Sequence, residues 1–203
     1  MLAKKDFVEL ELIGKVLPTE QIFMEEKSTI CLGAGQLLPE LEKNIEGKEV
    51  GQQFEIELKP EQAYGIRDPR LVQLVPLSKF SQNNINPIPG LQINIDGLLA
   101  TVRSVNGGRV IVDFNHPLAG KTLKFKINIL KKIENVQDKI RALIPESEEI
   151  NFSESKIEIL VKKALPKNIE KNIENLKIKK LKEFIPELEQ KEILFKAKTE
   201  SKD

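Results

Sequence analysis

A short amphipathic helix flanked by glycines is the feature that most limits how this chain can fold. The stretch 33–51 opens with a Gly-x-Gly loop and contains Gly47, a residue type that readily ends a helix. Between them, apolar residues recur at the spacing that places side chains on one helix face: Leu37, Leu38, Leu41 and Ile45. A helix this short is not stable alone in water, so its apolar face must pack on a sheet.

The flanking sequence contains the runs that predict this sheet. Residues 6–16 and 52–58 alternate apolar and polar side chains, which is the pattern of a half-buried strand. Two short apolar runs lie on either side of the charged stretch 25–28 and predict two strands joined by a loop. The predicted strands are 6–16, 21–24, 29–32, 52–58 and 121–133.

A smaller unit interrupts the sheet. Strand-like runs at 91–95, 98–105 and 109–114 are separated by Asp96-Gly97 and by Asn-Gly-Gly, which are typical of tight hairpin turns. The strand that follows them is needed to complete the first sheet. We therefore interpret this unit as an insertion into the first domain rather than as a domain that follows it.

The last third of the chain is rich in Lys, Glu and Ile and predicts another α+β unit. Asn135 is expected to cap a first helix, and strands are predicted at 151–153 and 156–162. A second helix begins near Asn168 and contains Pro186, which should kink or divide it before a final strand. The order helix, strand, strand, helix, strand is that of a two-layer unit.

Composition argues against several classes of function. The 32 Lys+Arg and 31 Asp+Glu residues nearly cancel, so no basic field attracts nucleic acid or an anionic membrane. The single cysteine, Cys31, cannot form an internal disulfide, and with one histidine it argues against a zinc site. No run approaches the ~20 apolar residues of a membrane span. We expect a cytoplasmic protein with no nucleic-acid or membrane partner.

Four motifs together resemble one known family. They are Gly33-x-Gly-Gln-Leu-Leu-Pro-Glu-Leu-Glu, Glu46-Gly-Lys-Glu-Val-Gly51, Ala63-Tyr-Gly65 and Asp113-Phe-Asn-His-Pro-Leu-Ala-Gly-Lys121. The pattern resembles the FKBP-type peptidyl-prolyl cis-trans isomerases, in the SlyD-like branch whose insert-in-flap domain interrupts the FKBP fold. The resemblance covers residues 1 to about 134. The tail is similar, in element order and position, to the extra C-terminal domain of long archaeal FKBPs.

The resemblance implies an α+β fold with three parts. An FKBP-like antiparallel half-barrel wrapped on a short helix is expected from residues 1–75 and 120–134. An insert-in-flap domain is expected at 76–119, and a C-terminal α-β-β-α-β domain at 135–203.

The resemblance also implies a peptidyl-prolyl isomerase that uses no cofactor and no metal. Rotation about an X-Pro bond faces a barrier of about 18–20 kcal/mol because the twisted transition state loses amide resonance. A dry apolar pocket with one or two fixed donors favours that state over the planar ground state. Such a site needs no acid, base or metal ion.

By resemblance, Leu37 and Leu38 form the pocket floor, Tyr64 offers its hydroxyl to the substrate carbonyl, and other residues complete the walls. Leu12 stands where the family has a tyrosine. The family's Phe-Asp pair appears here as Phe23-Met24-Glu25, so the acid is displaced or replaced, and weak activity is expected. For each leucine, ordinary core packing is the alternative interpretation. Leu41 replaces a floor aromatic of the family, and Phe125 forms a wall. The predicted site residues are Leu12, Met24, Glu25, Leu37, Leu38, Leu41, Tyr64 and Phe125.

The insert carries more apolar residues than one face of so small a sheet can bury. By resemblance it binds unfolded or nascent proline-containing chains, through Ile85, Ile88, Leu91, Ile93, Leu98, Leu99, Val102, Val112 and Phe114. The alternative is that these residues only pack on one another. A rival function is a holdase with little or no isomerase activity, whose C-terminal domain dimerises into a client cradle. His116 is expected to hold the junction between the two units by hydrogen bonding.

Overall fold

The computed structural model describes residues 1–95, 97–161 and 167–197, and of 167–170 and 197 only the backbone. The chain forms two compact units. The first contains Met1–Gly14, Ile22–Ile56 and the chain from Phe125 onward, and the second contains Lys15–Gln21 and Glu57–Lys124. Asp96 of the predicted hairpin turn and Lys162 at the end of a predicted strand lie outside the described residues.

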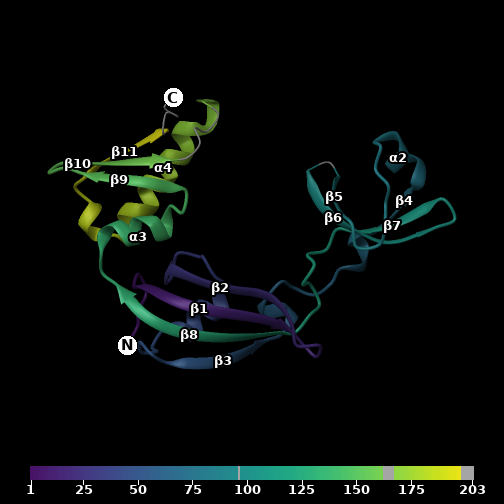
Figure 1. The fold of residues 1–203 in the computed structure, drawn as a ribbon, viewed down its shortest axis with the longest axis horizontal. Coiled ribbons are helices and arrows are strands. Elements are labelled where there is room, and N and C mark those ends of the chain that lie inside the picture. Colours follow the sequence, from purple (N-terminus) through teal and green to yellow (C-terminus); the bar gives the residue numbers. More distant parts are fainter. Residues whose placement is uncertain (96, 162–166, 198–203) are drawn as a thin grey trace, which may run out of the picture. The chain divides into compact units, whose positions relative to one another are not determined.

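The first unit is built on a four-stranded sheet in the order β2-β1-β8-β3 (Figure 1). The ends of these strands run on into the second unit. The sheet is completed by β8, which follows the elements of the second sheet in the sequence. The strands are β1 (Phe7–Val16), β2 (Gln21–Cys31), β3 (Gln53–Leu58) and β8 (Leu123–Ile133).

The predicted short helix is α1 (Pro39–Ile45), which buries Leu41 and Ile45 of the predicted face, whereas Leu37 and Leu38 precede the helix and are half-buried. Leu41 and Ile45 are almost completely buried. Alternate residues of the strands are buried as well, among them Leu10, Leu12 and Ile127. This is the burial that a helix lying on one face of a sheet produces. The mixed α+β class is confirmed.

The prediction of a loop at 25–28 is wrong. Strand β2 continues without a break from Gln21 to Cys31, and Glu25, Glu26 and Lys27 are exposed within it. Because β2 is an edge strand of its sheet, charged side chains on it remain in water while its backbone still pairs with β1. The charge run therefore marks an exposed strand edge rather than a turn.

The C-terminal elements form a three-stranded sheet, in the order β11-β10-β9, together with two helices (Figure 1). Strands β10 and β11 are parallel, and β9 and β10 are antiparallel. Asn135 caps α3, since its Oδ1 accepts from the backbone N–H groups of Gln137 (2.9 Å) and Asp138 (3.2 Å). The elements are α3 (Val136–Leu143), β9 (Ser147–Phe152), β10 (Lys156–Val161), α4 (Lys167–Phe184), the 3-10 turn η3 (Pro186–Leu188) and β11 (Glu192–Ala197).

These C-terminal elements share one apolar core with the end of the first sheet. Phe7 of β1, Cys31 of β2 and Ile133 of β8 belong to the same buried cluster as residues of both helices, such as Ile140 and Ile185. The side chain of Gln36 adds a polar link, because its Nε2 donates to the carbonyl of Ala142 in α3 (2.6 Å). The C-terminal elements therefore cover apolar surface of the first sheet.

The second unit contains a second four-stranded, antiparallel sheet in the order β4-β7-β6-β5. Its elements are β4 (Val72–Pro76), α2 (Leu77–Gln82), β5 (Gln92–Ile95), β6 (Leu98–Asn106) and β7 (Arg109–Asp113), preceded by the 3-10 turns η1 (Pro60–Gln62) and η2 (Pro69–Leu71). Its buried core is small: Phe80, Ile93, Ala100, Val102, Val110 and Val112. None of the helices in the described part of the chain has the length and apolar composition that crossing a membrane requires.

The thiol of Cys31 gives a test of the shared core. Its side chain is fully buried, and burial, followed by the nearby Glu42 carboxylate, raises its pKa to about 12. At pH 8 only about one thiol in ten thousand would be ionised, so we expect the native protein to react with a disulfide reagent far more slowly than the denatured chain. Removing residues 135–203 should accelerate the reaction strongly. Equal rates for the native and denatured chains would contradict the buried position.

Candidate functional site

The predicted pocket residues other than Tyr64 all belong to the first unit. Leu12, Leu41 and Phe125 are at most 1% exposed, so they lie in its core, and their role as pocket surface remains a prediction. Met24, Leu37 and Leu38 are half-buried, and Glu25 is exposed on β2. The members with accessible side chains are therefore at the start of α1 and on β2.

Phe125, a predicted site residue, is paired with a second ring that the sequence analysis did not assign to the site, Phe23 of β2. The rings of Phe23 and Phe125 meet edge to face, with centroids 5.8 Å apart and planes at 86°. A Cβ atom added at Gly14 would lie 2.6 Å from Cζ of Phe23, so only glycine leaves room for that ring. The sequence signal that could have revealed this contact is Gly14, because a glycine inside a strand often marks a place where another group approaches the backbone closely.

A buried carboxylate fixes the loop that leads into α1. Glu42 is 7% exposed, and its two oxygens accept from the backbone N–H groups of Gly33 (3.0 Å), Gln36 (3.0 Å) and Leu37 (3.3 Å). Three backbone donors of one loop are satisfied by one side chain of the helix that follows. The conformation of the loop before Leu38 is thus set by α1 itself.

Gln36 connects this loop to two other parts of the first unit. Its Oε1 accepts from the backbone N–H of Cys31 (2.8 Å), while its Nε2 donates to Ala142. Gln36 and Leu37 also line a cleft of about 700 Å³, whose other walls come from β1, β2, β8 and α3. Leu37 therefore has a surface toward α3, in addition to its predicted place in the pocket floor.

In the second unit Tyr64 stacks on His116. The ring centroids are 4.1 Å apart and the planes differ by 6°. The Nδ1 atom of His116 accepts from the backbone N–H of Leu118 (3.1 Å), and partial burial lowers the pKa of the imidazole below its usual 6.5. This hydrogen bond is local, two positions along the same segment, so the role of His116 in holding the junction between the two units stays a prediction. The stack with Tyr64 is an addition that only the fold reveals.

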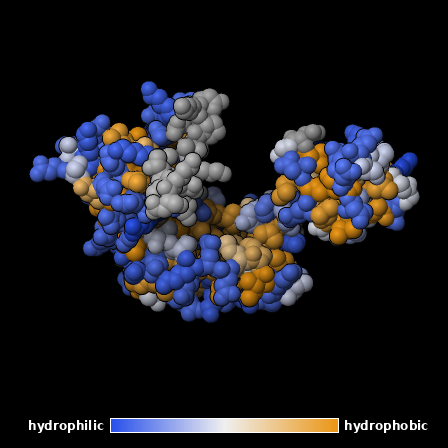
Figure 2. Space-filling model, turned by 45° about the horizontal axis from the view of Figure 1, so that its top comes forward, coloured by the Kyte–Doolittle hydropathy of each residue, from blue (hydrophilic) through white to orange (hydrophobic). Residues whose placement is uncertain are grey.

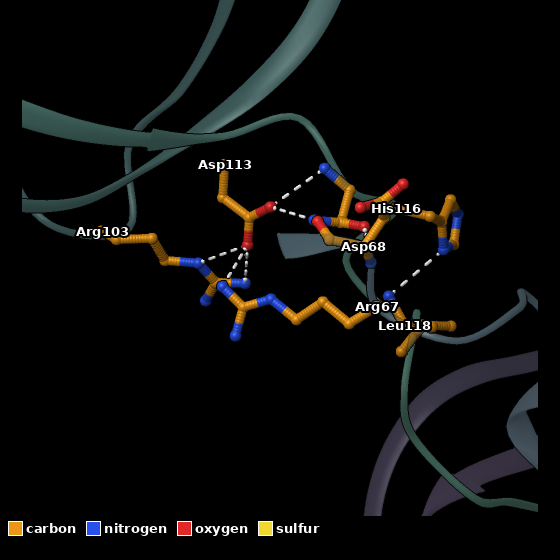
Figure 3. A network of polar contacts seen from close by, with 7 residues as sticks. Arg67, Asp68, Arg103, Asp113, His116 and Leu118 are labelled. Atoms are coloured by element: carbon orange, nitrogen blue, oxygen red, sulfur yellow. Dashed lines mark hydrogen bonds and ion pairs between the residues drawn. The ribbon is translucent and has the colours of Figure 1, made fainter. Parts of the chain in front are cut away.

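Asp113 is the centre of a polar network in the same unit (Figure 3). Its Oδ2 accepts from Arg67 (2.6 Å) and from two nitrogens of Arg103 (2.9 and 2.8 Å). Its Oδ1 accepts from the backbone N–H (3.0 Å) and the side-chain amide (2.7 Å) of Asn115. Asn115 in turn bonds the backbone of Asp68, so the segments entering and leaving the insert are joined.

The Asp113 carboxylate is strongly held in its charged form. Burial alone would raise its pKa, but the hydrogen bonds from Asn115 and Arg103 and the charge of Arg67 outweigh burial and lower the pKa to about 2. Nothing in the local sequence indicates which arginines reach Asp113, because Arg67 is 46 positions away.

The residues predicted to bind unfolded chains divide between surface and core. Ile88, Leu98 and Leu99 are 56–62% exposed, and Ile85, Leu91 and Phe114 are half-buried. Ile93, Val102 and Val112 are buried in the core of the insert, so they support the sheet and present no surface to a client. The binding role assigned to those three needs this correction.

Two further apolar residues are exposed on the insert. Leu74 of β4 and Ile111 of β7 are cross-strand partners and are 55% and 37% exposed. Figure 2 shows apolar surface gathered over this unit. Because β4 is an edge strand, the exposed pair lies beside unpaired backbone groups.

Comparison with known proteins identifies the family. The short-type peptidyl-prolyl cis-trans isomerase of Methanocaldococcus jannaschii is 34% identical over 145 residues, which are 64% of this chain and 92% of that protein. The chain belongs to the FKBP-type peptidyl-prolyl isomerase family. Within it the chain is SlyD-like: SlyD of Helicobacter pylori is 32% identical over 121 residues, 58% of this chain and 65% of that protein.

The family model described as "FKBP26, IF domain" matches residues 73–118 of this FKBP chain, which contain β5 to β7 and all of β4 except Val72. The FKBP-type 16 kDa peptidyl-prolyl isomerase of Escherichia coli is 34% identical over 104 residues, 49% of this chain and 70% of that protein. Across 1–95, 97–161 and 167–197, no group of three or more His, Cys, Asp and Glu side chains is placed to hold a metal ion.

The network around Asp113 predicts a specific acid sensitivity. A carboxyl group whose pKa is lowered on folding stabilises the fold above its ordinary pKa of 3.8, and this contribution is lost as pH falls through about 2. Asp113→Asn should lower the free energy of unfolding at pH 7 by about 1–3 kcal/mol, because two guanidinium groups lose their shared acceptor. Urea unfolding between pH 7 and pH 2.5 measures this. The difference between wild type and variant should shrink below pH 4, and a constant difference would contradict the assignment.

Proposed function

We propose that this protein catalyses cis-trans isomerisation of X-Pro peptide bonds. The observation that carries the proposal is its membership of the FKBP family, supported by a match to nearly the full length of a relative named for this reaction. The half-buried Leu38, Met24 and Phe23 offer apolar surface on the first unit. By the family resemblance, Tyr64, the single tyrosine of the chain, is the proposed hydroxyl donor.

The chemistry required of these residues is modest. The twisted amide is less polar than the planar one, so apolar walls favour it, and a donor to the substrate carbonyl orients the chain. Each 1.4 kcal/mol of preference for the twisted state increases the rate about tenfold. Since Leu12 and Met24 stand where the family has polar or aromatic side chains, we expect weak turnover of short peptides.

We further propose that the insert binds unfolded, proline-containing chains. Ile88, Leu98 and Leu99 on one part of the unit, and the pair Leu74 and Ile111 on another, give it exposed apolar surface. An extended chain can pair with an edge strand while its side chains meet such surface. Binding there would raise the effective concentration of X-Pro bonds at a weak catalytic site.

A holdase with little isomerase activity is the second candidate. The complete burial of Leu12, Leu41 and Phe125 favours it, because these side chains cannot contact a substrate in the described conformation. In this reading the C-terminal elements dimerise to form a cradle for clients. Leu160 of β10 and Leu194 of β11, both half-buried, would contribute to that contact.

Two conservative substitutions distinguish an isomerase from a pure holdase. Tyr64→Phe removes one neutral hydrogen bond, and we expect a loss of roughly two- to tenfold in kcat/KM for a proline tetrapeptide. Phe125→Leu should lower activity further, whereas Phe152→Leu, at an exposed phenylalanine of β9, serves as the aromatic control. Activity is measured beside suppression of aggregation of an unfolded client. Turnover near background in the wild type and in both variants, with aggregation still suppressed, would favour the holdase.

The surface of the insert can be tested without disturbing its core. Leu98→Ser and Leu99→Ser together remove exposed apolar groups, so the melting temperature should stay close to that of the wild type. We expect at least a severalfold slower catalysis of proline-limited refolding, with peptide turnover retained. The matched control is Leu176→Ser, at a leucine of α4 that is 67% exposed. Equal losses in the control and the insert variant would show that the effect is not specific to the insert.

A further inference from the structure

The stack of Tyr64 on His116 has no counterpart in the proposed reaction, which needs only the tyrosine hydroxyl. The two rings are nearly parallel at 4.1 Å, and the imidazole is fixed in turn by the Leu118 N–H at Nδ1. Accepting this bond requires a lone pair on Nδ1, so the described geometry belongs to the neutral ring with its proton on Nε2. The orientation of the ring that covers Tyr64 therefore depends on its charge state.

Protonation of His116 is incompatible with this arrangement. A proton on Nδ1 would face the Leu118 N–H, and two donors would then point at each other (Figure 3). Tilting the imidazole out of its present plane relieves the clash, and a tilted ring no longer lies parallel to Tyr64. The event involves one side chain and no covalent change.

The backbone around His116 is held independently of its side chain. The N–H of Gly120 donates to the carbonyl of Gly65 (2.8 Å), and the N–H of Ala119 donates to the carbonyl of His116 (2.9 Å). Gly120 has φ +76°, and a Cβ there would lie 3.3 Å from Cβ of Arg67, so the turn fits closely against that segment. The turn thus stays beside Tyr64 when the imidazole moves.

The charged groups around the ring do not favour the imidazolium. Asp113 is paired with Arg67 and Arg103, and Asp68 with Arg70, so both carboxylates are already compensated. A small pocket of about 250 Å³ beside His116 is lined by uncharged neighbours from β6 and from the segment after β7: Leu99, Thr101, Phe114, Asn115 and Pro117. The ring stacked on the imidazole belongs to another titratable residue, Tyr64. These surroundings agree with the lowered pKa of His116.

We propose that His116 is a positioning residue, which holds the Tyr64 ring while its imidazole is neutral and releases it when the imidazole is protonated. If Tyr64 serves the proposed isomerase reaction, the enzyme is then more active at neutral pH than in mild acid. The catalytic consequence rests on the proposed function, but the contact between the rings does not.

The composition of the chain allows a direct test with the full-length protein. It has one tyrosine, one histidine and no tryptophan, so intrinsic fluorescence reports Tyr64 and the imidazole NMR signals report His116 without ambiguity. Between pH 8 and pH 5 both signals should change together, with a midpoint below 6.5. His116→Phe keeps a flat ring that cannot be protonated, so its Tyr64 fluorescence should not change over this range. Asp113 titrates far below this window and does not interfere.

The same pH series is then measured for isomerisation of a proline tetrapeptide. The wild-type kcat/KM should fall with the His116 midpoint, to roughly one tenth at one pH unit below it. His116→Phe should show no such fall, and His116→Ala should have low activity throughout. A Tyr64 signal that does not follow His116, or an equal pH dependence in His116→Phe, would overturn the proposal. Failure of the proposed function looks different: Tyr64→Phe would then be as active as wild type, while the fluorescence titration persists.

Discussion

The mutual burial of a seven-residue helix and a sheet is the constraint on which the first unit depends. Helix α1 is too short to persist in water, and the sheet has an apolar face that must be covered. Glu42 joins the two requirements, because a carboxylate on the helix satisfies three backbone donors of the loop that leads into it. The residues at the start of α1 are therefore placed by a closed set of contacts rather than by a free loop.

The same loop connects the sheet to the C-terminal elements. Gln36 bonds Cys31 on one side and Ala142 on the other, and the apolar cluster around Phe7 and Ile133 continues into α3 and α4. A change in the C-terminal elements would thus be transmitted to the residues before Leu37 through direct packing and one side-chain amide. The C-terminal elements therefore have a structural role in packing on the first sheet, independent of any role in dimerisation.

The second unit is stabilised in a different way from the first. Its sheet buries only a small core and leaves several large apolar residues in water, which is costly unless they meet a partner. Polar contacts hold the segments that lead into and out of its sheet. The buried Asp113 carboxylate accepts hydrogen bonds from two arginines and an asparagine. Such a network holds geometry without adding apolar surface, so the exposed face of the insert stays available.

Much of the fold could be predicted from periodicity alone. The spacing of Leu41 and Ile45 identified the buried helix face, and the Asn135 cap placed the start of α3. The loop at 25–28 was wrong because side-chain polarity reports exposure, and an edge strand can be exposed as fully as a loop. The exposed and buried members of the insert could not be separated either, since a small sheet has two faces and composition does not say which one is covered.

The sequence by itself determined most of the elements and the family, because these follow from local spacing and from motifs of adjacent residues, while its pocket residues stay a prediction. Only the tertiary structure decided that Glu42, Asp113 and His116 hold the loops beside them. Their partners are set by side chains that meet across turns and strands, up to 46 positions apart for Asp113 and Arg67. Hydrogen-bond geometry acts over about 3 Å in space, and no pattern along the chain encodes that distance.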